Sequence, residues 1–222
     1  MRKEPPNAAD PRPIASSLLQ DEAIALAYAL TARAAERAGV RALAIKGTVS
    51  TAHGLRPART PADVDILIDP DGFPAFSRQL EAWGWWIRLG EFTDFPIPHH
   101  SVTYIHDQWP CDIDAHHRFP GFLAPPDQVF DTLWERRQLL SAAGQLVPMA
   151  DWASSVIIMA LHSMRSTPDN PRHSHELRHL IDLAPTWTQQ QRTDLAELAR
   201  ATGSLQSLDT LWPHLGINAD PT

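Results

Sequence analysis

The stretch that decides the fold is "DVDILID", Asp63–Asp69, in which two carboxylates stand two positions apart at the start of an aliphatic run. Successive side chains of a strand point to opposite faces, so Asp63 and Asp65 share one face while Val64 and Ile66 share the other. Unpaired carboxylates are costly to bury, and two like charges at this spacing repel each other. The stretch therefore predicts a strand that presents two acids to one ligand, for which a divalent cation is the commonest choice.

A second acidic stretch, "CDIDAHH" at 111–117, repeats this pattern, with Asp112, Asp114 and His116 on one face of a strand. It follows "SVTYIH" after the short break "DQWP", which is typical of an antiparallel hairpin. If the two acidic strands are neighbours, three carboxylates converge. Such a cluster is what a two-metal phosphoryl or nucleotidyl transfer site requires.

Upstream, "IKGT" at 45–48 has the composition of a phosphate-binding turn. Gly47 lets the backbone approach a ligand closely, and a helix beginning near Thr48 would direct its free amides at an anion. Lys46 is one of only two lysines in the chain, and an ammonium is a compact point charge suited to phosphate. Arg59 either reaches the same phosphates or forms a structural salt bridge; the sequence leaves both open.

The rest of the chain predicts an α+β protein with a small mixed sheet flanked by helices, followed by a mainly helical C-terminal half. Residues 1–20 are rich in proline and polar residues and predict a flexible arm. Residues 21–120 predict a core of four or five strands, and residues 121–222 a helical domain. The expected helices are 21–39, a short one before 54, 73–84, 128–140, 151–166, 174–187 and 191–203.

The composition of the chain limits the kinds of partner that it can bind. The net charge is -7 and the isoelectric point about 5.8, which excludes broad electrostatic capture of nucleic acid or anionic membrane. The single cysteine, Cys111, excludes an internal disulfide, and we expect no disulfide-linked partner. No apolar run has membrane-spanning length and no signal peptide is evident, so we expect a cytoplasmic protein without membrane contact.

Together these motifs resemble a known family. The segment from "LAIKGTVSTAHG" through "RTPADVDILIDPDG" to "CDIDAHHRF" is similar to the uncharacterised nucleotidyltransferase family of the DNA polymerase β-like superfamily. That family has aliphatic-Lys-Gly, then Arg-x-x-x-Asp-x-Asp, then aliphatic-Asp-x-His. The resemblance is strongest over residues 21–120. Members of the superfamily with proven activity usually have Gly-Ser where this chain has Lys46-Gly47.

The resemblance implies an enzyme that moves a nucleoside monophosphate from a nucleoside triphosphate, such as ATP, to an acceptor hydroxyl or phosphate, with release of pyrophosphate. The acceptor remains open between a small molecule, a peptide and RNA. Two Mg²⁺ ions are implied, with Asp63, Asp65 and Asp114 as catalytic metal ligands. The implied nucleotide-binding residues are Lys46, Gly47, Thr48 and Arg59. His116 matches the family's histidine and would orient Asp114 or close the hairpin.

Three alternatives stay open. The Arg-x-x-x-Asp-x-Asp pattern is also similar to nucleotidyltransferase toxins of abortive-infection systems, which modify RNA. The Lys-Gly departure permits a catalytically degenerate nucleotide-binding module. The histidine pairs 99–100 and 116–117 suggest a zinc hydrolase, but no HExxH or paired-cysteine spacing favours it.

Overall fold

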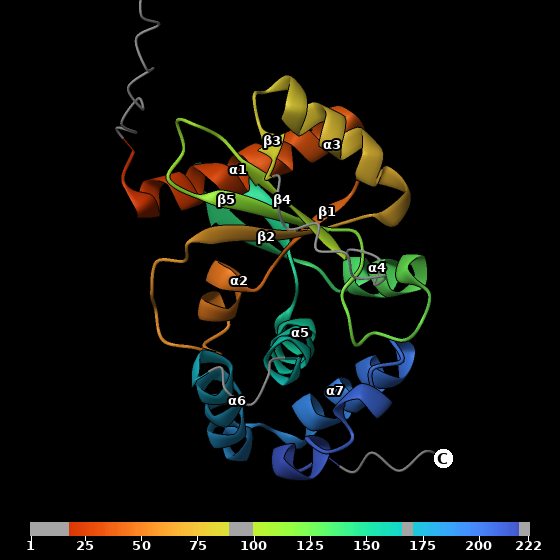
Figure 1. Ribbon diagram of the computed structural model, residues 1–222. Coiled ribbons are helices and arrows are strands. Elements are labelled where there is room, and N and C mark those ends of the chain that lie inside the picture. The colour runs from red at the N-terminus through yellow and green to blue at the C-terminus, as the bar shows by residue number, and fades with distance from the viewer. Residues whose placement is uncertain (1–17, 89–99, 166–170, 218–222) are drawn as a thin grey trace, which may run out of the picture.

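The computed structural model describes residues 18–88, 100–165 and 171–217. The arm predicted for residues 1–20 thus falls outside the described residues up to position 17. Two helices, α1 (Gln20–Ala38) and α3 (Phe73–Ala82), cover one face of a central sheet. On the other side lie α2 (Gly47–Ala52) and α5 (Trp152–Met164) (Figure 1). This layering confirms the α+β class.

Within the described residues the sheet has seven strands, in the order β3-β4-β5-β2-β1-β7-β6. In its centre β2 runs parallel to β5 and antiparallel to β1, and β4 pairs with β5 as the predicted antiparallel hairpin. Mixed pairing of this kind agrees with the expected mixed sheet. The strand bounds are β1 Ala42–Ile45, β2 Asp63–Ile68, β3 Trp86–Ile87, β4 Ser101–Ile105, β5 Asp112–His116, β6 Gln138–Ala142 and β7 Gln145–Met149.

The helices follow the predicted apolar spacing closely. The first ends at Gly39, whose left-handed φ of 67° closes the helix as the sequence predicts. The C-terminal half is mainly helical, with α6 and α7 beyond α5 (Figure 1). The remaining bounds are α4 Pro126–Glu135, α6 Pro171–Leu183 and α7 Gln189–Ala201, with 3-10 turns at Pro70–Gly72, Ala184–Thr186, Gln206–Leu208 and Trp212–Leu215.

One predicted helix is wrong at its end. The helix expected over 128–140 stops at Glu135, and residues 138–149 form the β6–β7 hairpin. Ala143 and Gly144 both have positive φ, 45° and 75°, which is the geometry of a two-residue hairpin turn. Residues 42–116 supply five strands, as expected for the core, and the hairpin adds two more from beyond residue 120 by pairing β7 with β1.

Arg136 joins three parts of the chain. Its guanidinium donates to Asp151 at 2.7 Å and to Asp194 at 2.6 Å, and these acids lie at the start of α5 and within α7. Asp151 also caps α5 by accepting from the amide of Ser154. Arg136 follows α4 directly, so one cation holds the β6–β7 hairpin and the helical half together.

Replacing Arg136 with alanine is expected to lower the free energy of unfolding by about 2 kcal/mol, because two charge-assisted hydrogen bonds are lost at a partly buried site. Urea denaturation followed by circular dichroism measures this loss. Arg33→Ala, which breaks the exposed pair with Glu36, is the control and should cost under about 0.5 kcal/mol. Equal losses for the two variants would contradict this role of Arg136.

The described residues include no helix that combines the length and apolarity needed to cross a bilayer.

The strands that carry the acids are deeply buried: Val64, Ile66 and Ile113 are at most 1% exposed. The acids of β2 lie on the other face of the sheet, toward α2 and α5. They therefore lie between the sheet and α5, where other groups of the chain must compensate their charge.

Candidate metal and nucleotide site

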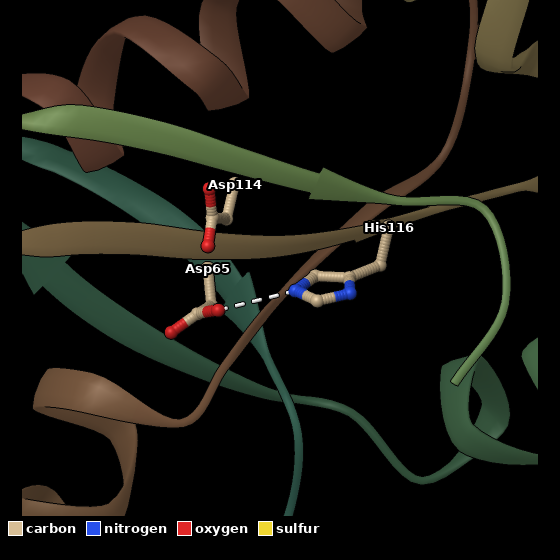
Figure 2. A group of neighbouring side chains, drawn as sticks. All are labelled: Asp65, Asp114 and His116. Carbon is tan, nitrogen blue, oxygen red and sulfur yellow. Dashed lines mark hydrogen bonds and ion pairs between the residues drawn. The ribbon is translucent and has the colours of Figure 1, made fainter. Parts of the chain in front are cut away.

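The two acidic strands lie side by side, as the sequence predicts. In the parallel pairing of β2 with β5, Asp65 is opposite Asp114 and Leu67 is opposite His116. Figure 2 shows the two carboxylates on adjacent strands, with the imidazole of His116 turned toward Asp65. One ligand atom from each of Asp65, Asp114 and His116 falls within 4.8 Å of the others. Two acids and an imidazole thus form one compact group.

Asp65 is held as an anion. Its Oδ1 forms an ion pair with the ammonium of Lys46 and accepts a hydrogen bond from Nε2 of His116 at 3.1 Å. Burial by itself raises the pKa of this carboxyl, but the charge of Lys46 and the His116 hydrogen bond outweigh it and bring the pKa to about 2. Asp65 is therefore ionised throughout the physiological range.

Asp114 differs from its neighbour. Its Oδ1 accepts a hydrogen bond from the hydroxyl of Thr103 at 2.6 Å. Burial, with a smaller contribution from the charge of Asp65, raises the pKa of Asp114 above its ordinary value despite that hydrogen bond. The pair therefore favours binding a further cation, because ionising Asp114 beside Asp65 costs energy that a divalent ion would recover. The oxygen donors fit a magnesium site, with Asp65 and Asp114 as the residues that would hold the ion.

The other acidic candidates are placed differently. Asp63 lines the same cavity, but its carboxylate lies outside the compact group of Asp65, Asp114 and His116. Asp112 forms an ion pair with Arg88 at 2.6 Å. His116 was expected to orient Asp114 or to close the hairpin, and its hydrogen bond goes to Asp65 instead of Asp114.

A cavity of about 200 Å³ opens beside the carboxylates. Lys46 and Gly47 form one part of its wall. Lys46 has φ 52° and ψ −147°, a conformation that favours glycine, so an L-residue there stores backbone strain. Gly47 has a φ of 37°, which strains any other residue, and a Cβ there would lie 3.0 Å from the hydroxyl of Tyr28, a tight contact that Tyr28 could relieve only by shifting. The turn thus favours glycine at this position and holds Lys46 in a strained conformation over Asp65.

Two residues expected at the nucleotide are not among those that line this cavity. Thr48 and Arg59 line another cavity, of about 510 Å³, beside α1, and Arg59 also lines one together with Arg56 and Glu176. The guanidinium of Arg59 also pairs with Glu176 of α6 at 3.4 Å. The structure therefore shows the structural salt bridge that the sequence left open for Arg59, and its contact with a nucleotide stays a prediction.

Several lining residues were not predicted from the sequence. Arg56, only 10% exposed, lies 3.8 Å from Glu176, and both line the cavity. His162 and His173 line it too, with their ring centroids 4.5 Å apart and their planes inclined by 55°. The titratable run "HSHELRHL" at 173–180, in α6, is the signal in the sequence that could have indicated His173 and Glu176 among them. The helical half therefore closes the cavity over the acidic strands. The remaining lining residues are Ser50, Pro61 and Met159.

His162 gives the site a pH dependence. Burial is the main cause that lowers its pKa to about 3. In the unfolded chain this histidine is protonated as the pH falls below about 6.5, whereas in the folded chain it stays neutral. The free energy of unfolding therefore falls as the pH drops below that value. We expect His162→Gln to remove about 1 kcal/mol of the loss between pH 7 and pH 5, allowing for its partial exposure.

Urea denaturation at both pH values measures this difference. His214→Gln, at an exposed position, serves as the control and should leave the wild-type pH dependence in place. An unchanged pH dependence in His162→Gln would contradict the buried neutral state of that histidine.

Comparison with known proteins decides the family. A family model described as an uncharacterised nucleotidyltransferase matches residues 16–217. The chain belongs to this family. The resemblance predicted from the motifs is confirmed, and the class of enzyme is a nucleotidyltransferase. A search of curated proteins gave no match.

Solved structures agree with the fold of this nucleotidyltransferase. One is the crystal structure of an antigenic nucleotidyltransferase-like protein from Paracoccidioides brasiliensis, with a TM-score of 0.51, 16% identity, and coverage of 93% of this chain and 96% of that one. Another is the solution structure of the antibiotic-resistance factor ANT(2'')-Ia, with a TM-score of 0.51, 12% identity, and coverage of 87% and 95%. At these identities the likeness establishes the shared fold.

Proposed function

We propose that this nucleotidyltransferase transfers a nucleoside monophosphate from a nucleoside triphosphate to an acceptor hydroxyl or phosphate and releases pyrophosphate. The observation that carries the proposal is the meeting of Asp65, Asp114 and Lys46 at one cavity. Two acids and one ammonium are complementary to a metal-bound triphosphate. We propose ATP as the nucleotide and two Mg²⁺ as the ions.

Each residue of the site has a distinct proposed role. Asp65 and Asp114, with Asp63 at the edge of the cavity, would hold the ions. Bound Mg²⁺ would offset the negative charge that grows on the phosphates during transfer. Asp114, whose pKa is raised, would take the proton of the acceptor hydroxyl. Gly47 would let the backbone come within hydrogen-bonding distance of a phosphate.

Lys46 would change partner when the nucleotide binds. In the structure its ammonium neutralises Asp65. A triphosphate in the cavity offers this ammonium a second, stronger anion, and moving to it would free an oxygen of Asp65 for a metal ion. Metal binding and nucleotide binding would then be coupled through one side chain, with each favouring the other.

The acceptor is proposed to be a small molecule. The chain is acidic overall, which counts against RNA. The antibiotic-resistance factor of similar fold also favours this class over a macromolecule, by analogy only. We propose a cytoplasmic enzyme, because nucleoside triphosphates and Mg²⁺ are both abundant in that compartment.

The direct test is incubation of the protein with each α-labelled nucleoside triphosphate, Mg²⁺ and a pool of small metabolites. Transfer of the label with equimolar pyrophosphate would support the proposal. Tight nucleotide binding without pyrophosphate would favour a degenerate binding module instead. Label in RNA, together with growth arrest on expression that Asp65→Asn relieves, would favour the toxin.

A further inference from the structure

A second cavity, of about 540 Å³, adjoins the acidic site on the same face of the sheet. Leu67 forms part of its floor, two residues beyond Asp65 on β2 and opposite His116 on β5. Its wall includes Phe119, whose ring centroid lies 5.7 Å from that of His116 and 5.9 Å from the ammonium of Lys46. Phe119 thus links the wall of this cavity to His116, which hydrogen-bonds to Asp65.

The lining of this cavity combines apolar side chains with positive charge. Leu67, Phe119, Phe122 and Val129 are apolar, while Arg118 and Arg165 bring two guanidinium groups. No carboxylate occurs among the described residues that line it. Such a surface is complementary to an anion with an apolar body, because an arginine binds a carboxylate bidentately.

His100 lies beside one of the two arginines of this cavity. Its Nε2 lies 3.4 Å from the guanidinium of Arg165, and its ring is 5.8 Å from that of His116. Burial first, and then the charge of Arg165, lower the pKa of His100 to about 4. The imidazole is therefore neutral at pH 7 and can accept a hydrogen bond from Arg165. The guanidinium is held in place by a neutral group and keeps its full charge for a ligand.

We propose that this cavity is the acceptor site, and that the acceptor is a small organic acid with an apolar body and a carboxylate bound by Arg118 and Arg165. This inference rests on the proposed function, since it names the acceptor class of the same reaction. The carboxylate would anchor one end of the molecule. The other end, carrying the nucleophilic hydroxyl, would reach past Phe119 toward Asp114.

Binding of the fluorescent anion 8-anilinonaphthalene-1-sulfonate tests the cavity without relying on activity. Matched competitors with one ring system are 1-naphthylacetate, its neutral amide 1-naphthylacetamide, and 1-naphthyl phosphate. We expect 1-naphthylacetate to displace the dye at a concentration about tenfold lower than the amide. Arg165→Gln should remove this preference, while Arg78→Gln, at an exposed position of α3, should preserve it.

The outcomes separate the possibilities. Equal displacement by acid and amide would overturn the proposal, as would a preference that survives both Arg165→Gln and Arg118→Gln in folded proteins. Stronger displacement by 1-naphthyl phosphate than by the acid would replace the carboxylate with a phosphate and overturn the acid assignment. Dye binding and its displacement by the acid should persist in Asp65→Asn. A wild-type protein that binds the acid but transfers no nucleotide to it would refute the proposed function and leave the acid site standing.

Discussion

Asp65→Asn is expected to lower the rate of pyrophosphate release at least about 1,000-fold at saturating Mg²⁺ and nucleotide, a rise of about 4 kcal/mol in the activation barrier. The change removes the carboxylate of Asp65, which contacts both Lys46 and His116. Isothermal titration with a nonhydrolysable ATP analogue, with and without Mg²⁺, measures how tightly the nucleotide binds and how far the metal ion strengthens this binding. We expect wild type, but not the variant, to bind the analogue more tightly when Mg²⁺ is present.

The matched control for this variant is Asp112→Asn. Asp112 lies opposite Asp63 in the same strand pair, but it bonds to Arg88 and does not line the cavity. It should keep activity within about threefold of wild type, because an exposed ion pair contributes little. If Asp65→Asn kept more than a tenth of the wild-type rate while remaining folded by circular dichroism, the central role of Asp65 would be lost.

Lys46→Met is expected to separate metal binding from nucleotide binding. Methionine keeps the length of the side chain but leaves Asp65 without its ammonium partner. Without ligands the variant should be less stable by about 3 kcal/mol, because a buried charge has lost its partner. In the absence of nucleotide, Mg²⁺ should bind the variant at least about tenfold more tightly than it binds wild type, since no tethered cation competes for Asp65.

Thermal unfolding across a series of Mg²⁺ concentrations measures both effects, because a ligand that binds only the folded state raises the melting temperature. The melting temperature should rise more steeply with the Mg²⁺ concentration for Lys46→Met than for wild type. Pyrophosphate release should still fall about 100-fold, because the positive charge on the triphosphate is lost. An equal dependence on Mg²⁺ in the two proteins would mean that Lys46 does not compete with the metal.

The fold was predictable from local sequence wherever apolar period and turn residues agreed. Gly39 marks the end of α1 correctly, and the acidic strands pair as their alternation predicts. The β6–β7 hairpin was missed because Leu139 and Leu140 extend the helical spacing of α4 into a segment that pairs in the sheet. The turn at 143–144 is Ala-Gly, which is a weaker hairpin signal than Asn-Gly.

The site was predictable only where its residues come from the two acidic strands and the turn before them. The juxtaposition of Asp65 with Asp114 follows from strand alternation. In contrast, the contribution of Arg56, His162 and His173 depends on how the helical half packs on the sheet, and long-range packing leaves no periodic signal. Likewise, no sequence pattern separates a salt bridge from ligand contact for Arg59, since both need the same side chain at the same position.

The ammonium of Lys46 has a consequence for how the acidic strands come together during folding. Many metal sites in small domains assemble only when the ion arrives, because the ligands repel one another without it. Here the chain supplies a cation of its own, the ammonium of Lys46, which is paired with Asp65. The acidic strands can therefore pair before any metal ion is bound, and the carboxylate charge is already compensated in the folded protein.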